Sequence, residues 1–444
     1  MRAFCRFPDS VPAVKGITMD IPYTPDVASQ FARFADPHNS ILLETADVES
    51  RSLAVLKAAL RVRCDGNEVT LTAFTETGRD IKAHVSRETS IDVLREIRDM
   101  GHLLVGAFAY DFEAEPLPAA HDTFPDYEFF VPEILLRVDH AKKTATITTH
   151  STLPNPRPQP VAAPDVPRTA TASKADAEFR RDVEKLQEHI AAKEIDQVVP
   201  SRYFSVECPD ALAAYRRLKE SNPSPYLFYL RGEDYDLIGS SPESNLRFNA
   251  DNREIRISPI AGTRPRGATP DEDYLNERDL RTNAKELAEH VMLIDLARED
   301  LGAIADDLRV PRVLNVDRYS RVMHLVSAVT GTLRPGLDAF DAYRACMTMG
   351  TLTGAPKPRA AQLIRDVEKH RRGSFGGAVG YFEPDGTMDT AIIIRSAFIK
   401  DDVAHVAAGA GVVADSTPQG EADETFHKAS AVLHAIAPEL EVVR

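Results

Sequence analysis

The stretch AGAGVVADSTPQGEADETFHK runs from Ala408 to Lys428 and combines two kinds of signal. In Gly409-Ala410-Gly411 the backbone amides can approach a ligand closely, because glycine has no Cβ. Ser416-Thr417-Pro418 then predicts a helix start, with capping hydroxyls followed by a proline in the first turn. Residues three or four apart share one face of that helix. The acidic face carries Glu421, Glu424 and Lys428, and the opposite face carries Phe426, Ala429, Leu433 and Ile436.

A second acidic pair lies upstream, where Lys285 to His290 reads KELAEH and repeats the Glu-x-x-Glu spacing. Apolar side chains predict a helix here too, at Leu287, Val291, Ile294 and Leu301. A lone acidic pair is usually just solvated, but four carboxylates facing one another would repel unless a cation lay between them. Hard oxygen ligands indicate Mg²⁺, which keeps several waters, so that not all four glutamates need bind it directly.

Composition limits the classes of partner. The chain has 444 residues, enough for one large core or two domains, and 53 basic against 68 acidic residues give a net charge of −15. That charge argues against nucleic acid and anionic membranes. The four cysteines are far apart, and neither a signal peptide nor a membrane-spanning apolar run is evident. We therefore expect a cytoplasmic protein with reduced thiols.

One composition change divides the chain. Leu153 to Arg168 carries six prolines among polar and small residues and predicts a linker or exposed loop. We therefore predict an N-terminal region at 1–152, a linker at 153–174 and a second domain at 175–440. The second domain should open with a helix, because Phe179, Val183, Leu186 and Ile190 follow a 3.6-residue period. In the N-terminal region we expect strands at 41–43, 69–72 and 103–108, an edge strand at 144–149 and a helix at 53–60.

Unusual residues cluster between Gln197 and Arg395. QVVPSR, at 197–202, is strand-like, GSSPES places Glu243 in a tight turn, and PIAGTRPRG, at 259–267, is a basic loop suited to an anion. Taken singly, each is more often a structural turn than a site. The segment GTLTGAPK, at 350–357, is a turn leading into a helix and a possible anion cradle, although its spacing differs from a Walker A loop.

Two further residues stand in apolar surroundings. His324 lies in the strand-like MHLVS, where a satisfied core histidine is the usual interpretation. Arg395 follows three isoleucines, and a buried arginine is costly unless it is paired with an anion. Taken together, the clusters indicate a buried site with a cation, an arginine and groups that exchange protons, for a small substrate bearing carboxylates.

From about 179 to 436 the chain resembles the chorismate-utilising enzymes, and most closely the large subunits of anthranilate synthases. The motifs that carry the resemblance are QVVPSR, SPYLFYL, GSSPES, PIAGTRPRG, DRYSRVMHLVS, RACMTMGTLTGAPKPRA, GGAVGYF, IIIRSAF and GAGVVADSTPQGEADET. The resemblance implies an α+β fold, with a large two-sheet β-sandwich core flanked by helices and the N-terminal accessory region packed on it. It also implies a lyase that converts chorismate and ammonia to anthranilate and pyruvate, the first step of tryptophan biosynthesis.

The resemblance also implies roles for individual residues. Mg²⁺ would hold the ring carboxylate of chorismate, with Glu289 and Glu424 bound directly and Glu286 and Glu421 acting through water. Arg395 and Tyr381 would clamp the enolpyruvyl carboxylate, since arginine suits a bidentate contact. The anion pocket would be completed by Thr351, Gly409, Gly411 and Lys428. Glu243 would protonate the departing C4 hydroxyl, and His324 would serve the step in which pyruvate is eliminated.

Two positions indicate the nucleophile. Relatives that use water carry a lysine base where this chain has Gln197, and aminodeoxychorismate synthases commonly carry a lysine where it has Ala261. Ammonia is already a nucleophile and needs no such base, so Gln197 and Ala261 favour ammonia delivered to C2. The chain has no Gly-x-Cys-x-Gly elbow, and a separate glutamine amidotransferase subunit would supply ammonia from glutamine.

The family's tryptophan site maps to Glu44, Thr45, Pro225, Tyr226 and Leu227, so tryptophan is expected to inhibit. Thr45 stands where the family has serine, and Glu299 where it has asparagine. Two alternatives stay open. The chain could be a 2-amino-2-deoxyisochorismate synthase, which stops before pyruvate loss, or a non-catalytic tryptophan-binding protein on the same fold.

Overall fold

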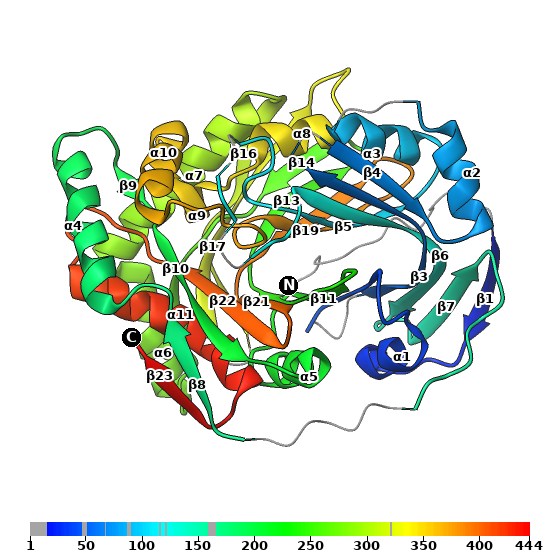
Figure 1. The fold of residues 1–444 in the computed structure, drawn as a ribbon. Coiled ribbons are helices and arrows are strands. Elements are labelled where there is room, and N and C mark those ends of the chain that lie inside the picture. The colour runs from blue at the N-terminus through cyan, green and yellow to red at the C-terminus, as the bar shows by residue number, and fades with distance from the viewer. Residues whose placement is uncertain are drawn as a thin grey trace.

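Helices and strands are mixed along the whole chain in the computed structural model, which describes residues 16–46, 51–66, 68–86, 90–114, 117–119, 122–158, 166–319 and 322–444 (Figure 1). In these residues, 21 strands are hydrogen-bonded into one continuous network, and two short strands form a second sheet. The predicted α+β class is confirmed. No helix in the described ranges is long and apolar enough to cross a membrane.

The N-terminal strands are arranged around two long antiparallel neighbours, β3 and β6, which are joined by further strands on both sides. Nearly all ladders in the structure are antiparallel, and the pairing of β8 with β23 is parallel. The strands before the predicted linker are β1 (Ile17–Ile21), β2 (Ser40–Glu44), β3 (Arg51–Asp65), β4 (Glu68–Ala73), β5 (Leu104–Phe108), β6 (Tyr127–Asp139) and β7 (Thr144–Thr149).

The strands after the linker continue the same network. They are β8 (Arg168–Ala172), β9 (Gln197–Val198), β10 (Ser201–Glu207), β11 (Tyr226–Arg231), β12 (Asp236–Ser241), β13 (Ser244–Asn249), β14 (Glu254–Ile257), β15 (Ile260–Pro265), β16 (Ala305–Arg318), β17 (Val322–Leu333), β18 (Gly354–Ala355), β19 (Ala378–Phe382), β20 (Met388–Ile392), β21 (Ser396–Lys400), β22 (Val403–Gly409) and β23 (Leu440–Val443). β2 pairs with β11 and β5 pairs with β19, so hydrogen bonds join strands from both sides of residue 152. The proposed division of the chain is thus not a division of the sheet.

The helices cover the outer faces of the strands. They are α1 (Val27–Phe34), α2 (Glu76–His84), α3 (Ser90–Asp99), α4 (Asp176–Ala191), α5 (Ala211–Ser221), α6 (Pro270–Thr282), α7 (Ala284–Gly302), α8 (Ala339–Cys346), α9 (Gly350–Thr353), α10 (Lys357–Glu368) and α11 (Pro418–Ile436). Side-chain caps fix the first residues of the two helices that carry the acidic pairs. Thr417 accepts a hydrogen bond from the Gly420 amide at the start of α11, and Asn283 accepts one from the Glu286 amide at the start of α7. Figure 1 shows α11 lying across β10 and β22.

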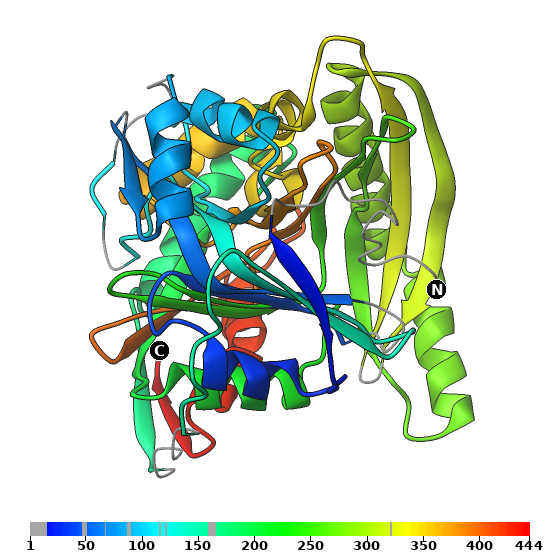
Figure 2. The same cartoon turned by 90° about the vertical axis from the view of Figure 1, so that its right-hand side faces the viewer.

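The core has three main parts. One cluster consists mainly of strand residues, among them Val55, Phe130, Phe228 and Phe398, which pack face to face as in a β-sandwich. A second cluster packs α1, α5 and α11 on one face of the strands, and a third packs α3, α7 and α8 on another. In Figure 2 the strands of residues near 310–330, in yellow-green, run steeply across the direction of the blue and green strands.

Several predictions about elements are confirmed and some are wrong. The strands at 41–43, 69–72 and 103–108 and the helix around Phe179 are present. The helix predicted at 53–60 is instead strand β3, because pairing with β2 and β6 overrides the helix preference of its leucines and alanines. The strand at 144–149 is not at an edge, since β7 pairs with both β1 and β6.

Two smaller corrections concern the linker and the second acidic helix. The predicted linker overlaps a strand at its end, since β8 spans Arg168–Ala172 and pairs with β10 and β23. Part of the proline-rich stretch, 159–165, lies outside the described residues. On α7, Ile294 and Leu301 are buried as expected, but Val291 is 47% exposed because it points away from the sheet.

Candidate active site

A cavity of about 550 Å³ opens where the ends of β12, β15, β17 and β22 meet α7, α9 and α11. Twelve of the residues selected from the sequence line it, although they come from segments up to 231 residues apart, from Gln197 to Lys428. They are Gln197, Glu243, Ala261, Glu286, Glu289, His324, Thr351, Arg395, Gly409, Gly411, Glu424 and Lys428. The fold therefore brings most of the predicted catalytic site together.

Glu243 sits in the turn between β12 and β13, and this turn is fixed by its backbone. The Ile392 amide donates to the Glu243 carbonyl at 3.0 Å, while the Glu243 amide donates to Ser241 Oγ at 3.3 Å. Its side chain is buried, and Oε1 has no hydrogen-bond partner among the described residues. Burial raises the pKa of Glu243 to about 8, although Thr351 and Arg395 nearby act to lower it. This carboxyl group is thus protonated at neutral pH.

Two other polar atoms in the cavity wall are buried without a hydrogen-bond partner in the described part of the chain. They are Gln197 Oε1 and Thr351 Oγ1. Buried polar atoms are nearly always hydrogen-bonded, so such atoms facing one cavity indicate where a ligand binds. Gln197 Nε2 donates to Glu289 Oε1 at 3.3 Å. A Cβ at position 411 would lie 2.9 Å from Gln197 Nε2, so a side chain there would have to displace the amide of Gln197.

The four glutamates are distributed over α7 and α11. Glu286, Glu289 and Glu424 line the cavity, whereas Glu421 is buried beside it with Oε2 unpartnered in the described structure. Burial raises the pKa of Glu289, Glu286 and Glu424 raise it further, and Lys428 opposes them. The pKa of Glu421 is also raised, by burial and by Glu424. The acidic groups therefore act on one another, as the sequence suggested.

Basic side chains partly neutralise this cluster. Lys428 Nζ lies 2.6 Å from Glu424 Oε1 and donates to the Gly409 carbonyl at 3.1 Å, and Arg264 donates to Glu286 Oε1 at 2.9 Å. Burial would raise the pKa of Glu424, but Lys428 holds it below its ordinary value. In the described ranges, no three His, Cys, Asp or Glu side chains are grouped closely enough to hold a metal. The carboxylates fit Mg²⁺ in donor type and in mutual repulsion, but they are not preassembled around a common point.

Arg395 lies between β20 and β21 in the left-handed backbone region, with φ of 50°. A residue with a Cβ pays about 1 kcal/mol or more for this conformation, so its persistence indicates a functional constraint. Among the described residues, its guanidinium has no salt-bridge partner, and burial lowers its pKa, with Glu243 and Glu424 acting in the opposite sense. An arginine held in this way is suited to binding a substrate carboxylate.

His324 on β17 pairs with Thr263 of β15, and its Nδ1 lies 2.9 Å from Thr263 Oγ1. Burial and the charge of Arg395 lower its pKa to about 4. The imidazole is therefore neutral, as a proton acceptor must be. Burial is the larger of the two causes, and the positive charge of Arg395 in the same cavity adds to it.

Tyr381 does not reach this cavity, so its predicted place in the carboxylate clamp is wrong. On β19 its side chain faces the core between the strand layers and a second cavity, because successive residues of a strand point to opposite faces. This second cavity is also lined by Glu44, Tyr226 and Leu227, three of the predicted tryptophan-site residues. Thr45 and Pro225 are buried nearby in sequence but do not line it.

Glu44 in the second cavity is already partnered. It accepts hydrogen bonds from Tyr215 Oη at 2.6 Å and from Lys219 Nζ at 2.7 Å. A second buried carboxylate, Asp389, also lines this cavity and accepts from Tyr226 Oη at 3.0 Å. The sequence alone did not single out Asp389. This cavity thus offers two acidic groups among aromatic side chains.

Sequence reasoning also missed residues of the first cavity. Lys285 precedes the acidic pair of α7, and Phe375 belongs to a loop before β19; both line the cavity. Lys285 could have been found from its place one residue before Glu286. Phe375 carries no polar group that would mark it in a sequence.

The site thus combines a protonated carboxyl group, a neutral imidazole, a buried arginine and a cluster of carboxylates. This is an arrangement for acid–base chemistry on a small anionic substrate. Residues 38–434 match the family model described as chorismate binding enzyme. The chain belongs to the chorismate binding enzyme family.

Individual proteins with known names are similar to this chain over most of its length. The anthranilate synthase component 1 of Vibrio parahaemolyticus is 43% identical, over 94% of this chain and 92% of its own length. That of Escherichia coli is 41% identical, over 96% of this chain and 97% of its own length. The crystal structure of anthranilate synthase component I from Streptococcus pneumoniae has a TM-score of 0.71 and 31% identity, covering 86% of this chain and 92% of its own.

Proposed function

We propose that this chain is the large subunit of an anthranilate synthase, which converts chorismate and ammonia to anthranilate, pyruvate and water. The observation that carries the proposal is the cavity in which Glu243, with a pKa of about 8, Arg395 and a neutral His324 come together. The names of relatives about 40% identical over nearly the whole chain support the same reaction.

The chemistry assigns each group a task. Arg395 binds the enolpyruvyl carboxylate and so orients the ring. Ammonia adds at C2, the ring double bonds shift, and the C4–O bond breaks as Glu243 protonates the departing hydroxyl to water. In the second step His324 takes the proton from C2 while the C3–O bond breaks, which forms the aromatic ring and releases enolpyruvate. A proton added at the methylene carbon of enolpyruvate then gives pyruvate. Gln197 Oε1, buried without a partner in the described structure, can accept a hydrogen bond from the incoming ammonia.

The acidic cluster is proposed to hold Mg²⁺, through Glu289 and Glu424 directly and through Glu286 and Glu421 by way of water. The support is the mutual influence of these carboxylates and the orphaned Oε2 of Glu421 among the described residues. Bound Mg²⁺ would hold the ring carboxylate of chorismate. Lys428 and Lys285 compensate part of the negative charge in its absence.

Ammonia is proposed to come from glutamine through a separate amidotransferase subunit. The name component 1, carried by the relatives, supports a partner component. Tryptophan is proposed to bind in the second cavity and to inhibit from there. The support is the placement of Glu44, Tyr226 and Leu227 in one cavity, apart from the residues of the acid–base site.

The function is tested by incubating the purified chain with chorismate, Mg²⁺ and ammonium, and identifying the products by chromatography and mass. We expect anthranilate and pyruvate in equal amounts, and no turnover with glutamine in place of ammonium until the amidotransferase subunit is added. Aminodeoxyisochorismate as the end product, without pyruvate, would show that the chain is a 2-amino-2-deoxyisochorismate synthase instead. Binding of tryptophan without any turnover would favour the non-catalytic alternative.

Removal of the metal should abolish turnover. We expect EDTA to stop anthranilate formation and added Mg²⁺ to restore it, because substrate binding would otherwise add another carboxylate to an already repulsive cluster. Glu424→Gln should weaken Mg²⁺ binding, measured by calorimetry with the metal alone, by about tenfold or more. The matched control is Glu184→Gln on the exposed face of α4. Full activity in chelator, or unchanged Mg²⁺ affinity in the Glu424 variant, would contradict the metal site.

Inhibition by tryptophan should depend on the charge of Glu44. In the proposed site this carboxylate holds the ammonium group of tryptophan, and an amide forms a weaker hydrogen bond than a charged group. Glu44→Gln should therefore raise the tryptophan concentration for half inhibition by about tenfold, while the rate without tryptophan stays unchanged. The measurement is an inhibition curve at fixed chorismate. An unaffected rate for the unaltered enzyme at millimolar tryptophan would contradict the regulatory site.

A further inference from the structure

A buried ion pair lies directly behind the wall of the substrate cavity. Glu368 ends α10, and Arg372 follows in the loop that leads to β19; their side chains are 1% and 2% exposed. Arg372 Nε donates to Glu368 Oε2 at 2.9 Å and Nη2 donates to Glu368 Oε1 at 2.7 Å. The contact is therefore bidentate and withdrawn from solvent.

The same two side chains hold the backbone of two other segments. Arg372 Nη1 donates to the Leu352 carbonyl at 2.7 Å, and Nη2 donates to the Val199 carbonyl at 2.7 Å. Glu368 Oε1 accepts from the backbone amide and the hydroxyl of Ser201, at 2.7 and 2.8 Å. One pair thus fastens the segment before β10 to helix α9.

These two segments carry residues of the cavity wall. Val199 and Leu352 line the cavity themselves, and Thr351 and Gln197 stand one and two residues away along the chain. A two-stranded ladder joins the segments further, with Ala355 opposite Gln197 and the Val199 amide donating to the Thr353 carbonyl at 3.0 Å. A shift of Arg372 would therefore move both the amide of Gln197 and the hydroxyl of Thr351.

Stability alone does not account for such a pair. Removing two charges from water costs several kcal/mol for each ion, and apolar replacements of buried pairs are often neutral or stabilising. Burial would raise the pKa of Glu368, yet Arg372 and Ser201 hold it below its ordinary value. What an apolar pair could not supply is a set of directed hydrogen bonds to two carbonyls and an amide.

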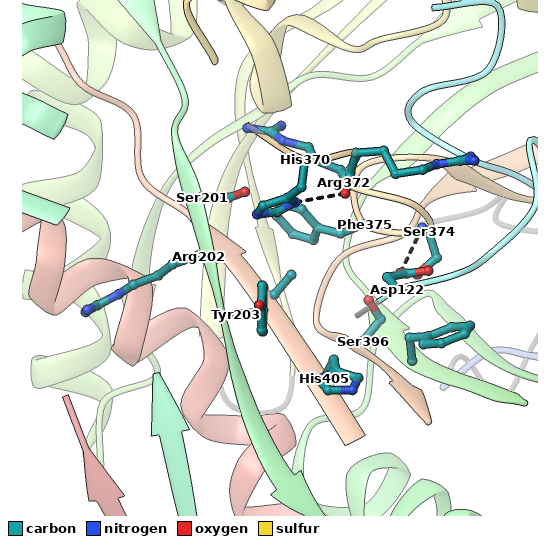
Figure 3. A pocket seen from close by; sticks show the side chains of 13 residues that line it. Asp122, Ser201, Arg202, Tyr203, His370, Arg372, Ser374, Phe375, Ser396 and His405 are labelled. Atoms are coloured by element: carbon teal, nitrogen blue, oxygen red, sulfur yellow. Dashed lines mark hydrogen bonds between the residues drawn. The ribbon is translucent and has the colours of Figure 1, made fainter. Parts of the chain in front are cut away.

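Residues of the N-terminal region contact this ion pair and the loop that carries Arg372. The guanidinium of Arg372 lies 4.6 Å from the ring centre of Tyr110, whose hydroxyl is 3.0 Å from Thr353 Oγ1. Asp122 accepts from the Ser374 amide at 2.9 Å. Figure 3, a close view of a neighbouring pocket, shows this contact near Arg372 and Phe375. The described residues that line the substrate cavity all come from position 197 onward. Tyr110 and Asp122 therefore act on the cavity indirectly, Asp122 through the segment 368–375 and Tyr110 through Arg372 and Thr353.

We infer that Glu368 and Arg372 are positioning residues, which set the distance between Gln197 and Thr351 and so place the substrate for reaction. Tyr110 extends this support to the N-terminal region. The inference rests on the proposed function, since it assigns these residues to the same reaction.

The test compares Arg372→Lys with Arg137→Lys, using the full chain, ammonium and chorismate. Both changes retain the charge but remove the guanidinium group. Arg137 is also paired with a buried glutamate away from the cavity, since its Nη2 donates to both carboxylate oxygens of Glu383, at 2.9 and 3.0 Å. Because misplacement by about 1 Å can cost roughly a hundredfold in rate, we expect kcat/KM of the Arg372 variant to fall by about that factor, with KM for chorismate raised. The Arg137 variant should stay within about twofold, as for a change remote from the site.

The outcomes separate the possible roles. A loss in kcat that matches the folded fraction from circular dichroism, with KM unchanged, would mean a purely structural role and overturn the inference. Equal kinetics of the two variants would overturn it too, while anthranilate formation by the unaltered chain leaves the proposed function standing. If Arg372→Lys does not fold, Glu368→Asp decides. It keeps the charge but shortens the side chain that holds Ser201 and Arg372, and we expect a raised KM of the folded protein, whereas kinetics identical to the unaltered chain would reject the inference.

Discussion

Glu243→Gln should reduce the rate of chorismate consumption by about a thousandfold, since a positioned general acid contributes roughly 10²–10⁴ in rate. The amide has nearly the same shape but cannot donate a proton to the C4 oxygen as the bond breaks. Glu243 is buried, with Oε1 unpartnered in the described part of the chain, so no other contact of that oxygen is lost. The measurement is the initial rate of chorismate loss in the presence of Mg²⁺ and ammonium.

The pH dependence gives a second readout. Glu243 must be protonated and His324 neutral, so kcat/KM should be highest between the two pKa values, about 4 for His324 and about 8 for Glu243. Activity should fall as pH rises through about 8. Free ammonia increases in the same range and would mask the fall, so total ammonium must be adjusted to keep free ammonia constant. A rate that still rises above pH 8 under these conditions would contradict the acid role.

Stability separates loss of the acid from damage to the fold. Burial raises the pKa of Glu243 from 4.5 to about 8, so the unfolded chain loses this proton at lower pH than the folded chain. The folded state is therefore penalised as pH rises between these values, and the penalty is absent in Glu243→Gln. We expect the variant to have an equal or higher Tm than the unaltered chain at pH 8. The control is Glu133→Gln, another buried glutamate, which accepts from Thr75 Oγ1 and lies outside the cavity.

Much of this site could be predicted from the sequence because its chemistry is local. The cap at Thr417, the Glu-x-x-Glu spacing and the glycines at 409 and 411 constrain the backbone within a few residues. The structure has a helix at each acidic pair, α7 and α11, and places both glycines in the cavity wall at or just after the end of β22. Residues from distant motifs could be grouped because the family resemblance supplied the tertiary arrangement. Composition and periodicity alone would have left them as separate turns.

The errors have a common physical origin, since each depended on which neighbours an element meets. The segment 53–60 is rich in leucine and alanine and favours a helix locally, but strands on both sides make it part of β3. Tyr381 and Phe382 are adjacent on β19, so their side chains point to opposite faces of the sheet. Tyr381 faces the core between the strand layers, and Phe382 faces the core under the helices. Lys285 and Phe375 can be assigned to the site only once the structure shows that they line the cavity.

His324→Met should separate the two steps of the reaction. Methionine has a similar size but no ring nitrogen that could accept a proton. Of the described residues, His324 and His427 are the histidines that line the cavity, and His427 is left in place. Addition of ammonia at C2 uses Glu243 and should continue within a few-fold. Loss of the C2 proton should fail, so that anthranilate and pyruvate formation falls by about 10²–10⁴ and aminodeoxyisochorismate accumulates.

Substrate binding should prepare His324 for this step. Without a bound carboxylate to oppose them, burial and the charge of Arg395 lower the pKa of His324 to about 4. A carboxylate bound to Arg395 would offset that charge and raise the pKa of the imidazole towards neutrality, where it is a better base. The acid limb of kcat, which reports the bound complex, is therefore expected at higher pH than the acid limb of kcat/KM. Coincident limbs would show that Arg395 does not tune the histidine.

The control for the histidine is His405→Met on β22, whose Nδ1 lies 2.9 Å from Ser205 Oγ and which does not line the cavity. It should form anthranilate and pyruvate in equal amounts, like the unaltered chain. Products are followed by the fluorescence of anthranilate, by a coupled assay for pyruvate and by mass for the intermediate. If His324→Met still yields anthranilate and pyruvate at the full rate, another group removes the C2 proton. If the unaltered chain itself stops at the aminated intermediate, the cavity completes one step only, because His324 then lies out of reach of C2 despite its neutral state.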